Sequence, residues 1–211
     1  MIEKKETLKF IFFDILTAIS SWALFFMFRK NLESQTFKIE DPAFIQGSIV
    51  VCFFWIFLYT LSGKYQSVLR ASRLQEFYRT LTQTIIGCII IFFMLIIDDI
   101  EYQKNHNYYY KSILFLFTTH FILTFFFRYV LTNIIVQKIK NGKIGFKTII
   151  IGSSSEALNI FNQITNTPRS TGNEFVGLIQ NSSNSKNLFL NKLKTLGTLS
   201  ELTCIIKENK I

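Results

Sequence analysis

The sequence has few of the residues that build disulfide frameworks and metal centres. It contains three cysteines and two histidines in 211 residues. Cys52 and Cys88 fall inside hydrophobic runs, and Cys204 lies in a more polar stretch, so no disulfide framework and no close Cys/His metal spacing can be drawn. Two histidines are also too few for a His-rich metal site or proton relay. The thiols are expected to be inert packing residues.

Carboxylates are sparse where catalysis would need them. In residues 143–211 the acidic residues are isolated from one another; they are Glu156, Glu174, Glu201 and Glu208. Phosphoryl transfer needs a metal-holding carboxylate beside a nucleophile, and no such pair is found. The sequence therefore predicts no catalytic residue, no metal and no cofactor in this chain.

Positive charge is in excess, because the sequence has 23 Lys and Arg but 14 Asp and Glu, which gives a net charge of +9. The basic residues flank hydrophobic runs and do not cluster with aromatic residues in one polar region. Anionic membrane lipid is therefore the expected partner, and nucleic acid is not.

What the sequence does have is long hydrophobic runs. It is 49% hydrophobic and 16% aromatic, and most of its 24 phenylalanines precede residue 130. Four runs, at about 10–28, 43–61, 80–97 and 112–136, approach or exceed the roughly 20 residues that cross a hydrocarbon core of about 30 Å. Residues 1–137 are predicted to form an all-α membrane bundle of four transmembrane helices.

The distribution of basic residues predicts an orientation. Twelve Lys and Arg lie in residues 1–9, between the second and third runs, and around the end of the fourth run. Five lie between the first and second runs and between the third and fourth runs. Because basic residues are retained in the cytoplasm, both termini are expected to be cytoplasmic.

Asp14 and His120 are ionisable residues inside the hydrophobic runs. Asp14 is within about one turn of the predicted cytoplasmic end of the first run, where its carboxylate is expected to reach headgroup water. A functional intramembrane carboxylate is the alternative. His120 is in the middle of the fourth run and is expected to be a neutral imidazole bonded to Ser or Thr of a neighbouring helix; a functional site is again the alternative.

The segment between the second and third runs is amphipathic. Its apolar positions recur at helical spacing, while Arg70, Arg73 and Arg79 follow a different face. This pattern predicts an interfacial helix at about 65–79 whose arginines contact lipid phosphates. Packing of the same helix on a soluble domain is an open alternative.

After the fourth run the pattern changes to that of an α/β protein. Residues 146–151 form a β-rich run that ends at Gly152, and a helix is expected to follow, as in a phosphate-binding βα turn. Gly152 and Ala157 match the dinucleotide fingerprint G-x-G-x-x-G/A, but Ser154 replaces the glycine that lets backbone approach a pyrophosphate. Gly152, Ser154 and Ala157 are therefore the candidate nucleotide-binding positions.

The remaining α/β pattern is short. EFVGLIQ at 174–180 is a second predicted strand, and Thr198 is expected to cap a helix that runs to about residue 209. A third strand is expected only after that helix. Residues 143–211 are thus predicted to be an incomplete Rossmann-like domain.

Several motifs in this order resemble one family. They are Y-x-x-x-x-R-x-S-R-x-x-E-F-x-R at 65–79, KTIIIGS at 147–153, FVGLI at 175–179 and LGTLSEL at 196–202, behind four hydrophobic runs. The whole chain resembles the N-terminal half of the large polyprenyl-phosphate hexose-1-phosphate transferases of bacterial exopolysaccharide and O-antigen synthesis. The resemblance implies a bacterial inner-membrane protein whose α/β part is Rossmann-like, of the CoA-binding-like type.

The family moves a sugar phosphate from a nucleotide sugar to undecaprenyl phosphate. Its catalytic C-terminal domain, with an Asp-Glu pair and Mg²⁺, has no counterpart in this sequence. The implied function is therefore a non-catalytic membrane and accessory region, with membrane lipids and a possible second copy as partners. Polyprenyl phosphate and nucleotide sugar would be contacted only through that other domain. The N-terminal region of a membrane nucleotide-sugar epimerase or dehydratase, and a stand-alone membrane binding module without activity, are the alternatives.

Overall fold

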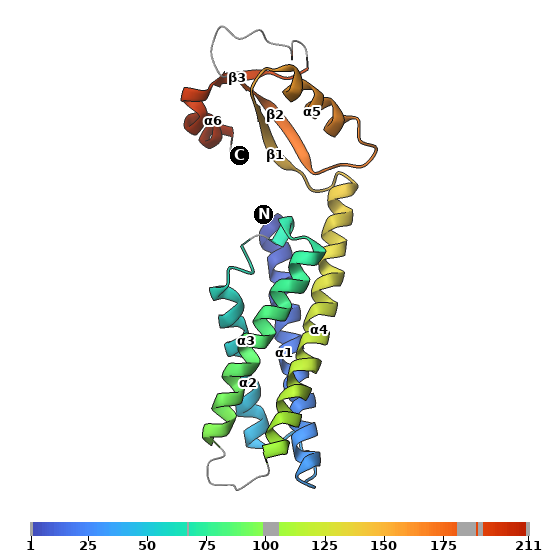
Figure 1. Ribbon diagram of the computed structural model, residues 1–211, viewed down its shortest axis with the longest axis vertical. Helices are drawn as coiled ribbons and strands as arrows, with labels where there is room; N and C mark the ends of the chain where they lie inside the picture. Colours follow the sequence, from blue (N-terminus) through green and yellow to red (C-terminus); the bar gives the residue numbers. More distant parts are fainter. Residues whose placement is uncertain (1, 67, 99–105, 181–188, 190–191, 210–211) are drawn as a thin grey trace. The chain divides into compact units, whose positions relative to one another are not determined.

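The computed structural model describes residues 2–66, 68–98, 106–180, 189 and 192–209. The chain divides into two compact units, residues 1–133 and residues 134–211, and each is described by itself. Figure 1 shows four long helices in the first unit and a small sheet with short helices in the second.

The first unit is a helix bundle. Its helices are α1 (Ile2–Leu32), α2 (Pro42–Leu61), α3 (Arg73–Asp98) and α4 (His106–Lys140), the last of which continues into the second unit. All four are long and apolar enough to cross a membrane, which confirms the prediction of a multi-pass membrane protein. The helices extend beyond the hydrophobic runs, because polar residues of good helical propensity continue them at the ends.

Large aromatic residues and glycines fit together in the core of the bundle. Trp55 and Phe25 are fully buried there, and Trp22 is nearly so. Each tryptophan lies against a glycine of a neighbouring helix. A Cβ atom added to Gly87 would lie 2.4 Å from Cη2 of Trp55, and one added to Gly47 would come even closer to Trp22. Small residues thus let these helices approach, as is usual inside membranes.

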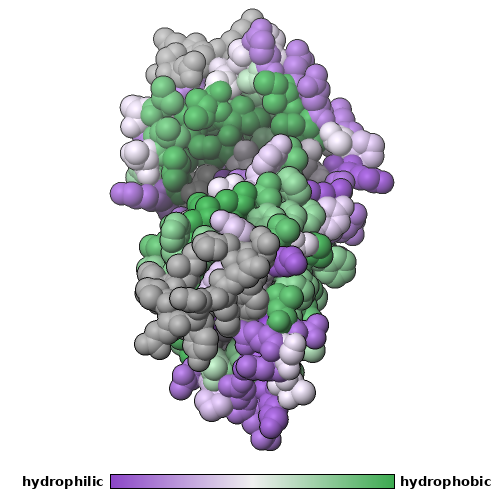
Figure 2. Space-filling view, turned by 60° about the horizontal axis from the view of Figure 1, so that its bottom comes forward, coloured by the Kyte–Doolittle hydropathy of each residue, from purple (hydrophilic) through white to green (hydrophobic). Residues whose placement is uncertain are grey.

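The outer surface of the bundle is apolar. Its most exposed large hydrophobic side chains include Phe53 and Phe57 of α2, and Ile122 and Phe126 of α4. Figure 2, which presents one face of the whole chain, shows hydrophobic residues gathered apart from hydrophilic ones. Such a surface is stable against lipid and would be costly in water.

The interfacial helix predicted at 65–79 was wrong in its extent. Residues 62–66 are turns, η1 (Val68–Arg70) is a single 3₁₀ turn, and α3 begins at Arg73. Ser72 starts α3, because its side-chain oxygen accepts a hydrogen bond from the backbone N–H of Gln75 at 3.2 Å. The helical spacing of Leu74, Phe77 and Tyr78 therefore belongs to the first turns of the third membrane helix.

The second unit contains a parallel three-stranded sheet in the order β1-β2-β3. In chain order its elements are β1 (Phe146–Ile151), α5 (Ser155–Thr165), β2 (Asn173–Gln180), β3 (Thr195–Thr198), η2 (Leu199–Glu201) and α6 (Leu202–Asn209). Leu178 and Ile179 of β2 are fully buried. Phe161 of α5 packs edge-on against Phe175 of β2, with 5.1 Å between ring centroids. The two strands and the first helix predicted from the sequence are confirmed.

The third strand precedes the last helix, whereas the sequence analysis expected a strand only after it. β3 has four residues and pairs parallel to β2, with Gly197 opposite Ile179. A four-residue strand containing a glycine with φ of +154° shows no alternating pattern, so the sequence did not reveal it. The helix predicted to follow Thr198 is confirmed. The carboxylate of Glu201 accepts a hydrogen bond from the backbone N–H of Thr198, and α6 follows.

Candidate functional site

A buried ion pair joins the first and last helices of the bundle. Asp14 of α1 and Arg128 of α4 are each about 1% exposed. Nε of Arg128 donates to Oδ1 of Asp14 at 2.9 Å, and Nη2 donates to Oδ2. This is the bidentate arrangement in which a guanidinium holds a carboxylate most firmly.

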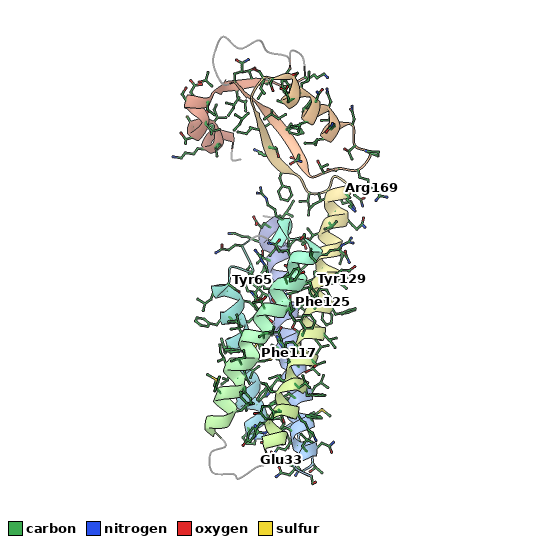
Figure 3. All side chains as sticks on the ribbon, in the orientation of Figure 1. Glu33, Tyr65, Phe117, Phe125, Tyr129 and Arg169 are labelled. Carbon is green, nitrogen blue, oxygen red and sulfur yellow. The ribbon has the colours of Figure 1, made fainter. Side chains whose placement is uncertain are left out.

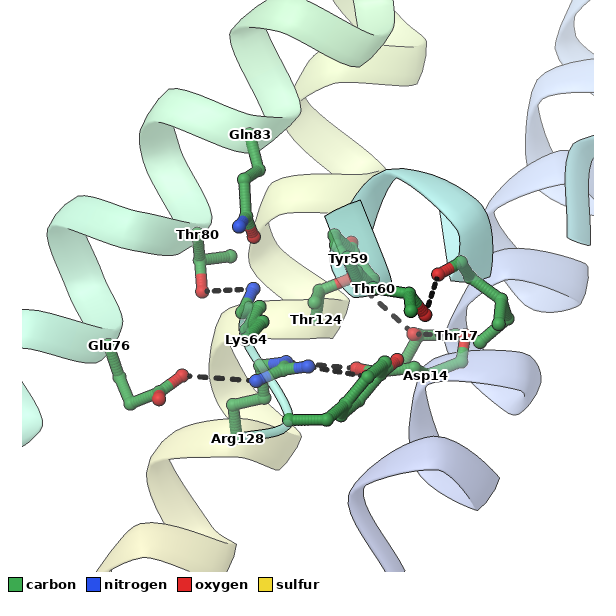
Figure 4. A network of polar contacts seen from close by, with 12 residues as sticks. Asp14, Thr17, Tyr59, Thr60, Lys64, Glu76, Thr80, Gln83, Thr124 and Arg128 are labelled. Carbon is green, nitrogen blue, oxygen red and sulfur yellow. Dashed lines mark hydrogen bonds and ion pairs between the residues drawn. The ribbon is translucent and has the colours of Figure 1, made fainter. Parts of the chain in front are cut away.

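Arg128 also binds a second carboxylate, from α3. Its Nη1 lies 3.3 Å from Oε2 of Glu76, which is 2% exposed. Figure 4 shows the guanidinium between Asp14 on one side and Glu76 on the other. Its Cζ atom also lies 5.4 Å from the ring centroid of Phe10 and 5.3 Å from that of Tyr59. One side chain therefore ties together α1, α3 and α4 and contacts a ring of α2.

The connection after α2 folds back over this ion pair. The hydroxyl of Tyr65 donates to Oδ2 of Asp14 at 2.7 Å. Lys64 is about 1% exposed, its Nζ donates to the hydroxyl of Thr80 at 3.2 Å, and it lies 4.3 Å from the ring centroid of Tyr59. Burial, and then the nearby charge of Arg128, hold the pKa of Lys64 well below its usual range. The network thus contains two carboxylates and two basic side chains.

His120 forms a second group of buried contacts, nearer the middle of α4. Its Nδ1 is hydrogen-bonded to the hydroxyl of Ser21 at 2.9 Å and its Nε2 to the hydroxyl of Tyr59 at 2.9 Å. The ring stacks on Trp55 with 3.8 Å between centroids. Because Ser21 donates its own proton to the carbonyl of Ala18, this pattern fits a proton on Nδ1 and an acceptor at Nε2. The predicted hydrogen bond to a serine of another helix is confirmed.

The prediction for Asp14 was wrong. Its carboxylate does not reach headgroup water, since its partners are Arg128 and Tyr65 and the side chain is about 2% exposed. The sequence analysis counted Arg128 as a basic residue of the cytoplasmic exit, yet it lies inside the bundle. A signal existed: Ser112, His120, Thr124, Arg128 and Thr132 recur at multiples of four along α4, and all are buried. Such a stripe predicts an internal polar face.

The charged side chains of this network bind to other side chains within it. Each charged group is neutralised or hydrogen-bonded by another side chain, which is the condition under which charges remain inside a membrane bundle. Within the described residues no group of three His, Cys, Asp or Glu side chains is placed to hold a metal ion. The arrangement is suited to fixing helix positions.

The candidate nucleotide-binding residues come together at the end of β1. Gly152 has φ of +105° and donates its N–H to the carbonyl of Ile179 at 2.8 Å. Ser154 is the N-cap of α5, and its hydroxyl accepts a hydrogen bond from the N–H of Ala157 at 3.4 Å. The nearby hydroxyls of Ser154 and Ser155 lower the pKa of the exposed Glu156 carboxylate, to which the hydroxyl of Ser155 donates at 3.2 Å. The turn therefore has the shape that the sequence predicted, with a serine capping the helix at the position of the missing glycine.

The three candidate arginines are not on one helix. Arg70 lies in η1, whereas Arg73 and Arg79 lie in the first two turns of α3. Arg70 and Arg73 are exposed, and Arg79 is half-buried. The Cζ atom of Arg73 lies 6.0 Å from the ring centroid of Tyr129 on α4.

Comparisons of the chain with protein-family models, with curated proteins and with solved structures found no significant match.

Proposed function

We propose that this chain is the non-catalytic membrane and accessory region of a polyprenyl-phosphate sugar-1-phosphate transferase that initiates exopolysaccharide or O-antigen synthesis. The supporting observation is the succession of two architectures: four membrane-length helices lead directly into a parallel β1-α5-β2-β3 unit. In the classic Rossmann order the first three strands are neighbours in this sequence, which favours a Rossmann-like unit.

In this proposal the bundle anchors the enzyme and fixes the position of its cytoplasmic part. The ion pairs of Arg128 with Asp14 and Glu76 join three helices, so the bundle is suited to a rigid platform. The transfer of the sugar phosphate is assigned to a separate domain with the Asp-Glu pair and Mg²⁺ of the family. Polyprenyl phosphate and nucleotide sugar are contacted there, while this region contacts membrane lipids and a second copy. The bacterial inner membrane is its location, with both termini cytoplasmic.

The experiment that tests the proposal is to read the source gene beyond the codon for Ile211. A following transferase domain with a membrane-associated Asp-Glu pair supports the proposal. A following epimerase or dehydratase domain would instead make this the front of a nucleotide-sugar epimerase, and a stop codon would favour a stand-alone membrane module.

A biochemical arm tests the non-catalytic role. The purified chain, given a nucleotide sugar, Mg²⁺ and polyprenyl phosphate, is expected to release no nucleotide above a protein-free control. Reproducible release that is abolished by substitution of Glu156 or Glu201 with Gln would contradict the proposal, because it would locate a catalytic carboxylate within this chain.

A further inference from the structure

A ladder of aromatic rings runs along the line where α3 meets α4. Phe117, Phe121, Phe125 and Tyr129 follow one another at four-residue spacing on α4, with 5.8 to 6.1 Å between successive ring centroids. Figure 3 shows Phe117, Phe125 and Tyr129 at successive heights of this helix. Phe77 of α3 packs edge-on against Phe121 and Phe125. The rings on the ladder are partly exposed, so an apolar strip faces the lipid.

Arg73 lies at one end of this ladder. It is exposed beside the terminal ring of Tyr129, and among the described residues no carboxylate is within ion-pair distance of it. Its neighbours Leu74 and Tyr78 are among the most exposed apolar side chains of α3. An arginine among exposed apolar residues at the start of a membrane helix extends its guanidinium to the interface, where the phosphates of lipids lie.

An apolar cavity lies at the other end. It has a volume of about 290 Å³ and is lined by side chains of α3 and α4 that include Cys88, Ile89, Phe92, Ile113 and Phe117. Phe117 and Tyr129 are twelve positions apart, which corresponds to about 18 Å of helix. Half of a hydrocarbon core is about 15 Å, so a hydrocarbon chain anchored near Arg73 lies along most of the ladder and ends before the cavity.

We propose that the α3–α4 seam, from Arg73 along the aromatic ladder, binds an anionic phospholipid. The guanidinium of Arg73 binds the lipid phosphate, and one acyl chain lies along the rings. A helix from a second copy fits this surface less well, because it would bury Arg73 without a counter-charge. The inference requires only that the bundle crosses a membrane, so it stands apart from the proposed transferase role.

Tryptophan quenching measures this binding in the whole chain. A Tyr129→Trp variant places a reporter in the seam, while Trp22 and Trp55 remain as a buried background common to every variant. The protein is reconstituted in phosphatidylcholine vesicles, and phosphatidylglycerol with brominated acyl chains is titrated against brominated phosphatidylcholine. One arginine near an anionic headgroup contributes about 1 kcal/mol, so phosphatidylglycerol is expected to bind about fivefold more tightly at the reporter.

Matched variants distinguish lipid binding in the seam from attraction of anionic lipid to the net charge of the whole protein surface. Arg73→Gln in the reporter protein is expected to reduce the preference to about onefold, whereas Lys5→Gln, at an exposed position of α1, is expected to leave it unchanged. A Phe53→Trp reporter on the exposed face of α2 is expected to show no preference. The proposal is overturned if both reporters prefer phosphatidylglycerol equally, or if the preference at Tyr129→Trp survives Arg73→Gln in protein whose circular dichroism is unchanged.

Discussion

Arg128 binds both carboxylate oxygens of Asp14 across the contact between α4 and α1, although 114 residues separate the two in the chain. Both side chains are buried, and Glu76 adds a third helix to the same guanidinium. The pair therefore fixes the spacing of α1 and α4 together with the hydrogen bond between Ser21 and His120. Apolar side chains alone can slide past one another at little cost in lipid.

Arg128→Met is expected to destabilise the bundle by about 3 to 5 kcal/mol, because it leaves two buried carboxylates without their cation. The measurement is the free energy of unfolding in mixed detergent micelles. Arg29→Gln is the control, since Arg29 pairs with Glu33, just past the end of α1, at i,i+4 spacing, and such pairs contribute about 0.3 to 0.5 kcal/mol. Asp14→Asn should cost less in the Arg128→Met background than alone, and strictly additive costs would contradict a direct interaction.

His120→Phe is expected to destabilise the protein by about 1 to 3 kcal/mol. The phenyl ring can still stack on Trp55, but the buried hydroxyl of Tyr59 loses its acceptor at Nε2. Thermal unfolding in detergent measures the change. Thr118→Ala is the matched control on α4, because the exposed hydroxyl of Thr118 bonds only the carbonyl of Leu114 in its own helix. Equal stability of the two variants would argue against a structural role of His120.

Gly87→Ala is expected to destabilise the bundle by about 1 to 3 kcal/mol even though alanine favours helix formation by about 1 kcal/mol. The added Cβ would lie 2.4 Å from the indole of Trp55. In a Trp55→Phe background, where the ring is smaller, the same substitution should cost less. Thr82→Ala, at an exposed position of α3, is expected to change stability by less than about 0.5 kcal/mol. A cost that does not depend on residue 55 would rule out this contact as the cause.

Lys64 makes the stability depend on pH. Its pKa is lowered in the folded protein. In the unfolded chain the pKa of lysine is about 10.4, so between the two pKa values the unfolded chain binds more protons than the folded protein. The contribution of Lys64 to stability is therefore expected to become more favourable as pH rises from the lowered folded pKa towards 10.4. Lys64→Met should flatten the rise of the unfolding free energy with pH, and Lys5→Met, at an exposed position, should not. Parallel pH profiles for the wild type and Lys64→Met would contradict the prediction.

A phosphatase reporter tests the proposed orientation. Fused after Lys104, between α3 and α4, it is expected to be active outside the cytoplasm; fused after Lys140, it is expected to be inactive. Reporter protein levels measured by immunoblot serve as the control. Activity of the reporter fused after Lys140 would show that the orientation is the reverse of the one proposed, or that one of the four helices does not cross the membrane.

Local pattern was enough to predict much of the architecture. The four helices follow from the length of the apolar runs, because hydrogen bonds within a helix are what satisfy a lone backbone segment in lipid. β1 and α5 follow from a β-branched run, a glycine with positive φ and a capping serine, all within twelve residues. In each case the determinants are neighbours in the chain, so the sequence carries them directly.

Which buried polar groups meet depends on the packing of the helices. The sequence shows that Asp14, Glu76 and Arg128 exist, but hydrophobic periodicity indicates which face of a helix is buried and not which helix covers it. The burial of Lys64 likewise depends on the fold of the 62–66 turns over Thr80 and Tyr59. The short β3 also depends on tertiary contacts, since its pairing with β2 supplies the backbone partners that four residues cannot supply alone. Neighbouring residues therefore predict the four long helices, β1, β2 and α5, whereas β3 and the pairing of the buried charges depend on residues that are far apart in the chain.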